Sequence, residues 1–250
     1  MESHLPFVGM AREIGRLSLA FGAGDPVLLL GPQGSGKTRL IKEALRSHKN
    51  VLYIAWKPTL HDLLAAMARA LIAAHHADFL RRAALTSGPG ADPEAWLAVQ
   101  TSIHLKGLLW TAVESSSVTM TLDGIAGAGF PAYRFFQRIS HTPGMALFAA
   151  SRDAFSLGAL ARLFWNPARV LNVPPLPERN AKQLFEVAAG HFKLRHLHLA
   201  EFRDKVLESA RGNPGQIIEM CRLATQPQYH AGRYIKFSSL RIDTVMKFAP

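Results

Sequence analysis

The sequence contains a single cysteine, Cys221, so it cannot form an internal disulfide. Its fold therefore does not depend on an oxidising compartment. No apolar run approaches the roughly 18 residues that a membrane-spanning helix needs, and residues 1–17 lack the charged and then apolar order of a signal peptide. From these absences we expect a cytoplasmic location.

Charged residues are also scarce, at 19% of the chain, and no internal repeat or low-complexity tract is visible. Hydrophobic residues make up 48%, which is enough to bury a core and excludes a disordered chain. Because domains most often run to about 100–150 residues, 250 residues have room for one large domain or for an ordinary domain with a smaller one.

The charges that are present are unbalanced, since 29 Lys and Arg face 18 Asp and Glu, a formal net charge of +11. A positive field favours anionic partners such as nucleic acid, acidic lipid or an acidic protein face. No dense Lys or Arg run occurs, so the excess is equally compatible with a generally basic composition that serves solubility.

Short apolar runs alternate with longer segments of helical period, which is typical of a parallel sheet covered by helices. The pattern therefore predicts an α/β fold with a parallel five-stranded sheet. Its strands are expected over 27–30, 51–55, 118–122, 146–150 and 170–173. The pattern also predicts that the helix opened by the glycine-rich segment 31–38 continues over 41–48. Further helices are predicted over 60–74, capped by Thr59, and over 94–114, broken near Gly107, with a loop over 86–93.

After Pro174 the pattern changes to helical segments without strands between them, over 177–190, 200–210 and 216–224. Residues 229–248 mix β-branched and aromatic side chains and are compatible with a short hairpin or a helix. We therefore expect two domains: an α/β core over 1–175, and a small helical domain with a short C-terminal extension over 176–250.

The segment 31–38 reads GPQGSGKT and fills every fixed position of the phosphate-loop pattern. Its glycines let the backbone curl so that successive N–H groups and the start of the next helix point at phosphates. It follows an apolar strand and opens a helix, as this mechanism requires, so we expect ATP with Mg²⁺ here. The predicted contacts are Gly31, Pro32, Gln33, Gly34, Ser35, Gly36, Lys37, Thr38 and Arg39, with Lys37 on the β and γ phosphates and Thr38 on the metal.

A carboxylate is expected near the metal, and Asp123 follows the strand predicted over 118–122. It should lie at the C-terminal edge of the sheet, where ligands of open α/β folds bind, so we predict Asp123 as the second magnesium-binding residue. The next residue is Gly124, where fast ATPases usually carry a carboxylate that orients the attacking water. This glycine predicts slow hydrolysis, or none.

The strand predicted over 146–150 is followed by Ser151, Arg152 and Asp153. If it lies between the strands that carry the phosphate loop and Asp123, its tip faces the γ-phosphate. Ser151 would then hold the nucleophilic water and Arg152 would sense the γ-phosphate. The other interpretation of Arg152 is a solvated arginine that pairs with Asp153.

Taken together, these motifs resemble a single-module AAA+ or STAND-type P-loop ATPase, over about residues 5–225. The resemblance implies that the base is contacted by Val8, Gly9 and Met10, although arginine is usual where Met10 stands and Arg12 is a possible substitute. It further implies base contacts from Pro175 and Leu176, and a helical domain that forms a lid over the base.

The turn Gly212-Asn213-Pro214-Gly215 decides between branches of this resemblance. Many AAA+ proteins carry a sensor arginine near its end, where this chain has Gly215 and Gln216. STAND proteins more often have a Gly-x-Pro turn, so we favour a STAND or related initiator-like protein with Pro214 at the nucleotide. An ordinary helix break is the alternative.

Several arginines are candidates for contacts with a neighbouring subunit or with nucleic acid: Arg81, Arg82, Arg134, Arg138, Arg162 and Arg169. Arg162 and Arg169 occupy the region where AAA+ arginine fingers usually lie. Histidines 75, 76, 191, 196 and 198 are interpreted as solvated, because no Cys or carboxylate lies beside them at ligand spacing.

The resulting hypothesis is an ATP-binding molecular switch, or slow ATPase, whose nucleotide state controls formation of a homo-oligomer or binding of a partner, with DNA favoured by charge. One alternative is a nucleotide-binding protein without hydrolysis. Another is a small-molecule kinase with Asp62 and Arg81 as base and lid arginine, which the separate helical domain disfavours.

Overall fold

The computed structural model describes residues 5–21, 26–87, 92–114, 118–143 and 145–248. Contacts group the chain into two units. The first, the sheet unit, comprises Gly15–Leu30 and Ala44–Asn172. The second, the phosphate-loop unit, comprises Met1–Ile14, Gly31–Glu43 and Val173–Pro250. Because the phosphate loop groups with the C-terminal helices, the predicted boundary between residues 175 and 176 stays a prediction.

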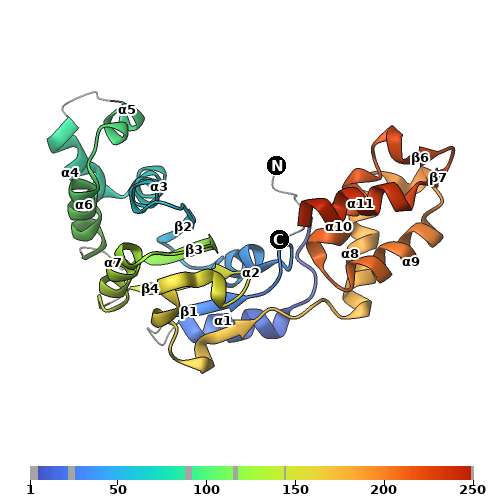
Figure 1. The fold of residues 1–250 in the computed structure, drawn as a ribbon, viewed down its shortest axis with the longest axis horizontal. Coiled ribbons are helices and arrows are strands. Elements are labelled where there is room, and N and C mark those ends of the chain that lie inside the picture. The colour runs from blue at the N-terminus through green and yellow to red at the C-terminus, as the bar shows by residue number, and fades with distance from the viewer. Residues whose placement is uncertain (1–4, 22–25, 88–91, 115–117, 144, 249–250) are drawn as a thin grey trace. The chain divides into compact units, whose positions relative to one another are not determined.

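The sheet unit contains five parallel strands in the order β2-β3-β4-β1-β5 (Figure 1). Their bounds are β1 Val27–Leu30, β2 Val51–Ala55, β3 Thr119–Ile125, β4 Ala146–Ser151 and β5 Val170–Asn172. Most of their side chains are buried, because a parallel sheet is covered on both faces. The predicted fold class is confirmed, and β4 lies between β3 and β1 as the argument on Ser151 and Arg152 required.

The strand register brings the C-terminal ends of the strands to one edge, with Leu30 beside Ser151 and Asp123 beside Ala150. One prediction was wrong here, because β3 continues beyond Asp123 to Ile125. The pairing shifts between Asp123 and Ile125, and Gly124 has φ +72°, a left-handed conformation that glycine adopts without steric cost. A glycine bulge therefore lengthens the strand.

The helices of the sheet unit pack around a core that includes Phe79, Phe136 and Leu63. They are α3 Leu60–Ala73, α4 Ala77–Ser87, α5 Pro93–Ala98, α6 Ser102–Glu114 and α7 Phe130–Ser140, with the 3-10 helices η1 Phe155–Leu163 and η2 Pro167–Arg169. Thr59 caps α3 as predicted. No single helix in the described ranges is long and apolar enough to cross a membrane, although α3 and α4, bent by 115°, pass that test as a pair.

The prediction of a break near Gly107 in the helical segment 94–114 was wrong. The chain breaks after Ala98, and α6 runs through Gly107. Asp92 starts the separate helix α5 by accepting hydrogen bonds from the N–H groups of Glu94 and Ala95. Gly107 is exposed, and a glycine inside a helix costs only about 1 kcal/mol. The helix α4 also extends into the predicted loop, of which residues 88–91 lie outside the described residues.

The phosphate-loop unit has its own core, with Phe185, Phe202, Ile217 and Leu240 among its buried side chains. Its helices are α8 Glu178–His191, α9 Leu199–Ala210, α10 Pro214–Leu223 and α11 Phe237–Phe248, with η3 Leu194–His196 and η4 Pro227–Tyr229. The division between the units falls inside α1 (Ala11–Phe21), after Ile14, and before the last residue of α2 (Lys37–Ala44), after Glu43. The helix that the phosphate loop opens is confirmed, but it ends at Ala44 and not at His48 as predicted.

The sequence of residues 229–248 was compatible with a hairpin or a helix. The structure has both, a short hairpin followed by a helix. Strands β6 (His230–Ala231) and β7 (Tyr234–Ile235) pair antiparallel, and α11 follows. Gly232 in the connecting turn has φ +63°, which explains how so short a hairpin closes.

Candidate nucleotide site

The phosphate loop has a backbone that only glycine fits at two positions. Gly34 has φ +81° and Gly36 has φ +91°, both in the left-handed region. The N–H of Ser35 donates to the Pro32 carbonyl at 3.2 Å, and that of Leu40 donates to the Gly36 carbonyl at 2.8 Å. The turn therefore leads directly into α2, and the first turn of a helix is where proteins commonly bind an anion.

Lys37 folds its ammonium group over the loop. Its Nζ donates to the carbonyls of Gly31 at 2.7 Å and Pro32 at 3.0 Å, and lies 3.5 Å from Ser35 Oγ. The loop itself thus holds the positive charge beside the N-terminus of α2. A phosphate bound there would gain both the ammonium charge and the dipole of the helix.

The Gly-Asn-Pro-Gly turn binds the phosphate loop directly. Asn213 Oδ1 accepts from the N–H of Gln216 at 3.1 Å and so caps α10, while its Nδ2 donates to the Gln33 carbonyl at 2.9 Å. The N–H of Gly215 donates to the Gly34 carbonyl at 2.8 Å. Two hydrogen bonds, made by residues about 180 positions apart in sequence, therefore join the loop to the start of α10.

These two segments approach so closely that side chains are excluded. A Cβ added to Gly215 would lie 2.6 Å from Gly34 Cα, and one added to Gly34 would lie 2.5 Å from Cε1 of Phe248. Phe248 is the last residue of α11. The contacts of Asn213, Gly215 and Phe248 with the phosphate loop are not visible in the sequence, because only folding brings these residues to the loop. The glycines of the turn are the one sequence feature that points to this close approach.

A cavity of about 150 Å³ lies beside the loop. Seven predicted nucleotide contacts line it together: Val8, Met10, Gly34, Gly36, Arg39, Leu176 and Pro214. Phe7, Leu184, Gly215 and Ile218 complete the wall. Its volume is below the roughly 300 Å³ at which pockets for whole ligands begin, and its lining is largely apolar. It therefore fits a planar base whose phosphates extend to the loop.

Two predicted base contacts, Gly9 and Pro175, are not part of the cavity wall and instead support it. Gly9 has φ +77°, and a Cβ there would lie 3.1 Å from Leu176 Cδ2. Pro175 packs against Gly212, whose carbonyl accepts from the N–H of Leu176 at 2.8 Å. Both therefore hold Leu176 in the wall.

Arg39 connects α2 to the N-terminal segment. Its guanidinium donates to the Leu5 carbonyl and lies 5.8 Å from the centroid of the Phe7 ring. These contacts place Phe7 and Val8 at the cavity, and they account for an arginine at the position after Thr38.

In the sheet unit, the residues predicted to act on the γ-phosphate form a bonded turn. Ser151 is 1% exposed, and its hydroxyl donates to the Ile125 carbonyl at 2.9 Å. Arg152 Nε donates to Asp153 at 3.1 Å. Hydrogen bonds from Ser156, followed by that from Arg152, lower the pKa of the Asp153 carboxyl below its usual value. To hold a water, Ser151 would have to exchange its present bond, so the roles of Ser151 and Arg152 stay predictions.

The residues predicted to hold Mg²⁺ belong to different units. Thr38 is the second residue of α2 in the phosphate-loop unit, and Asp123 lies in β3 of the sheet unit. A hydroxyl and a carboxylate are oxygen ligands of the kind that Mg²⁺ prefers, but their joint role stays a prediction. Cys221 is buried, which raises the pKa of its thiol to about 12 and leaves it inert.

No family model matches this chain, and no curated protein matches it. Solved structures do match. A STAND protein with a tetratricopeptide repeat sensor from Pyrococcus horikoshii is 17% identical (TM-score 0.54), with 100% of this chain and 34% of that chain covered. Cdc6p from Pyrobaculum aerophilum is 15% identical (TM-score 0.57), with 90% and 64% covered.

The Orc1 protein of Aeropyrum pernix, solved in complex with DNA, is 15% identical with a TM-score of 0.61, and 99% of this chain and 68% of that chain are covered. This chain thus spans about a third of the STAND protein and under two thirds of Cdc6p. At identities this low, the similarity shows the fold alone. The chain shares the fold of these P-loop ATPase structures, a five-stranded parallel sheet flanked by helices with further helices after it.

Proposed function

We propose that this protein is an ATP-binding switch, in which the phosphate loop binds ATP with Mg²⁺ and passes the nucleotide state to α10. The observation that carries the proposal is the pair of hydrogen bonds from Asn213 and Gly215 to the loop carbonyls of Gln33 and Gly34. A ligand can shift an equilibrium only through contacts that differ between two states, and these bonds provide such contacts.

The coupling follows from the geometry of the peptide group. The Gln33 carbonyl that accepts from Asn213 belongs to the same rigid plane as the Gly34 N–H. The Gly34 carbonyl that accepts from Gly215 likewise shares a plane with the Ser35 N–H. When a phosphate draws these N–H groups toward itself, the planes turn, and the hydrogen bonds to the start of α10 strengthen or break.

The residues would then divide the work as follows. Lys37 supplies charge to the phosphates, Thr38 and Asp123 hold Mg²⁺, and Ser151 with Arg152 responds to the γ-phosphate. Bound Mg²⁺ would neutralise phosphate charge during transfer to water. Because Gly124 offers no carboxylate to orient that water, hydrolysis is slow and serves to reset the switch.

The output we propose is nucleotide-dependent self-association or binding of nucleic acid. The net charge of +11 supports an anionic partner, and the similar Orc1 structure was solved in complex with DNA. If nucleotide state controls this binding, linkage requires different DNA affinities with an ATP analogue and with ADP.

Two alternatives differ in their support. Binding without hydrolysis has the support of Gly124 alone. The kinase hypothesis loses support, because Asp62 accepts a hydrogen bond from the Thr59 hydroxyl at 2.6 Å and helps to cap α3, while Arg81 lies 3.6 Å from Asp78 in an ion pair. Both side chains already have structural roles.

Calorimetric titration with Mg²⁺ and ATP tests nucleotide binding. We expect Lys37→Ala to abolish detectable binding, because the ammonium contacts phosphates and is not part of the core. Lys182→Ala is the matched control, since Lys182 belongs to the same unit, pairs with Glu178 on the surface at 2.5 Å, and lies outside the cavity wall. ATP affinity close to wild type in Lys37→Ala would overturn the site.

A further inference from the structure

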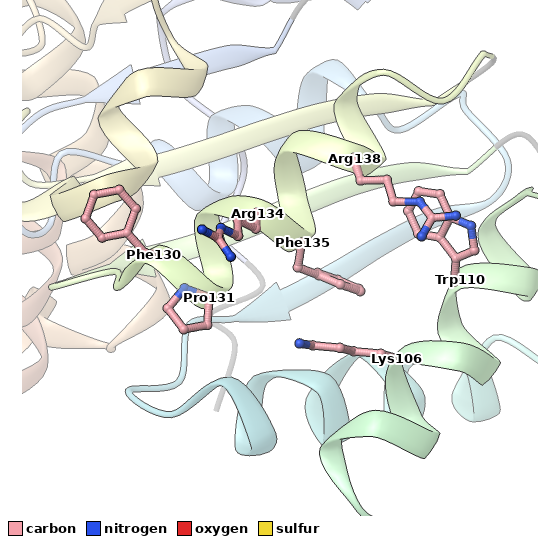
Figure 2. A pocket seen from close by; sticks show the side chains of 7 residues that line it. All are labelled: Lys106, Trp110, Phe130, Pro131, Arg134, Phe135 and Arg138. Atoms are coloured by element: carbon pink, nitrogen blue, oxygen red, sulfur yellow. The ribbon is translucent and has the colours of Figure 1, made fainter.

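We propose that the sheet unit carries a second site, which binds single-stranded nucleic acid in the groove between α6 and α7. The groove has a volume of about 480 Å³ and is lined by Lys106, Trp110, Phe130, Pro131, Arg134, Phe135 and Arg138 (Figure 2). None of these residues belongs to the nucleotide site. The groove would be the surface for the nucleic-acid partner named in the proposed function, and its binding of an oligonucleotide can be measured without any ATP present.

The charge of the groove selects an anion. Its lining contains three cations, Lys106 on α6 and Arg134 with Arg138 on α7, and no carboxylate, amide or hydroxyl side chain. Arg134 and Arg138 are four residues apart and so share one face of α7. Glu114, which lies 3.7 Å from Arg138, is outside the lining. A ligand with several negative charges is therefore favoured.

Arg138, which lines the groove, is oriented by the ring of Trp110. The Arg138 guanidinium lies 3.6 Å from the centroid of the Trp110 ring, and Figure 2 shows the two groups stacked. Stacking fixes the plane of the guanidinium, whose Nη2 also lies 3.7 Å from Glu114 Oε1, so a phosphate here would compete with that carboxylate. Less conformational freedom is then lost when a phosphate binds.

Aromatic side chains supply the second half of the recognition. Phe130 is 53% exposed although it is large and apolar. The Arg162 guanidinium lies 4.9 Å from its ring centroid and adds a fourth cation at the same edge. Cations interleaved with aromatic rings are the combination by which proteins hold single strands, with phosphates on the cations and bases stacked on the rings.

The same lining disfavours other anions. Duplex DNA keeps its bases paired and would offer only phosphates, and an acidic peptide would leave the aromatic walls without a stacking partner. A protein tells RNA from DNA through the ribose hydroxyl, and this lining has no side-chain acceptor for that hydroxyl. We therefore expect single-stranded DNA and RNA to bind about equally.

Fluorescence anisotropy of labelled single strands of about 12 nucleotides, within the range of known single-strand sites, tests the proposal without any nucleotide present. Phe130→Ala should weaken binding about fivefold or more, because stacking is lost, while Phe130→Tyr should retain it. Arg134→Gln should reduce the log–log salt slope by about 0.7 between about 50 and 200 mM salt. Trp165→Ala and Arg69→Gln change an exposed aromatic and an exposed cation outside the groove and should leave binding unchanged.

Three results would overturn the site: a duplex that binds as tightly as the single strand, polyglutamate that competes equally at the same salt, or full affinity in folded Phe130→Ala. Phe130→Leu, which keeps an apolar side chain, separates lost stacking from lost packing, and it should bind as weakly as Phe130→Ala. Lys37→Ala should bind the oligonucleotide like wild type, so failure of the ATP site and failure of the groove are distinguishable.

Discussion

The cavity beside the phosphate loop and the groove between α6 and α7 differ in how they meet an anion. Around the first, backbone N–H groups and the end of a helix would bind the phosphates that we propose, and the cavity wall is apolar except for Arg39. The second relies on three cationic side chains, and its lining also includes Phe130 and Pro131, the first two residues of α7. A backbone site depends on glycines and close approach, whereas a side-chain site tolerates loop changes and responds to salt.

The largest effect should come from exchanging one glycine in each unit for alanine. Gly34→Ala places a side chain in the left-handed region and against Phe248 and Asn213, so we expect a loss of about 2 kcal/mol or more in unfolding free energy, together with lost ATP binding. Gly107→Ala lies in a helix with open space around it and should stabilise by up to about 1 kcal/mol. Urea unfolding measures the change in unfolding free energy for both variants. Equal changes in Gly34→Ala and Gly107→Ala would remove the distinction between the units.

How much of this contrast the sequence reveals depends on distance along the chain. The phosphate loop and the five strands were predictable, because a contiguous glycine pattern and apolar runs encode them locally. The bond from Asn213 to Gln33 was not, because about 180 residues separate the partners. The stack of Arg138 on Trp110 likewise requires two helices to meet.

Other differences have local causes. Asp92 caps α5, which begins one residue before the predicted helix start at Glu94, but the helix ends after Ala98 and a new one begins at Ser102, whereas the break was predicted near Gly107. The Ser151 hydroxyl, which the family pattern assigns to water, donates here to the Ile125 carbonyl beside the bulge at Gly124, and its role toward a water stays a prediction. A motif specifies residue types, and only packing decides which partner each one finds.

The second prediction concerns the rate of hydrolysis. We expect wild type to turn over below about 1 s⁻¹, at the low end of enzyme turnover numbers, because Gly124 carries no carboxylate. Gly124→Glu should raise the rate, although φ +72° makes any side chain there strained. Gly124→Asn is the matched control, since asparagine tolerates this conformation but is no base. A phosphate-release assay that gives tens of turnovers per second in wild type would show that another group positions the water.

A smaller effect is expected at Ser151. Ser151→Ala leaves the buried Ile125 carbonyl without its hydrogen bond from the hydroxyl, which should lower the unfolding free energy by about 1–3 kcal/mol. If Ser151 also serves the γ-phosphate, hydrolysis will slow in the folded variant while ATP affinity holds. Denaturant titration and the phosphate-release assay separate the two roles, and an unchanged rate would reduce Ser151 to a structural residue.

The most direct test of the switch is amide hydrogen exchange at the start of α10, compared between a non-hydrolysable ATP analogue and ADP. We predict that protection of the Gly215 and Gln216 amides differs between the two nucleotides in wild type. In Asn213→Asp, which keeps the cap acceptor but loses the donor to Gln33, the difference should shrink while nucleotide still binds. Identical protection with both nucleotides in wild type would contradict the proposal that the phosphate loop signals through this turn.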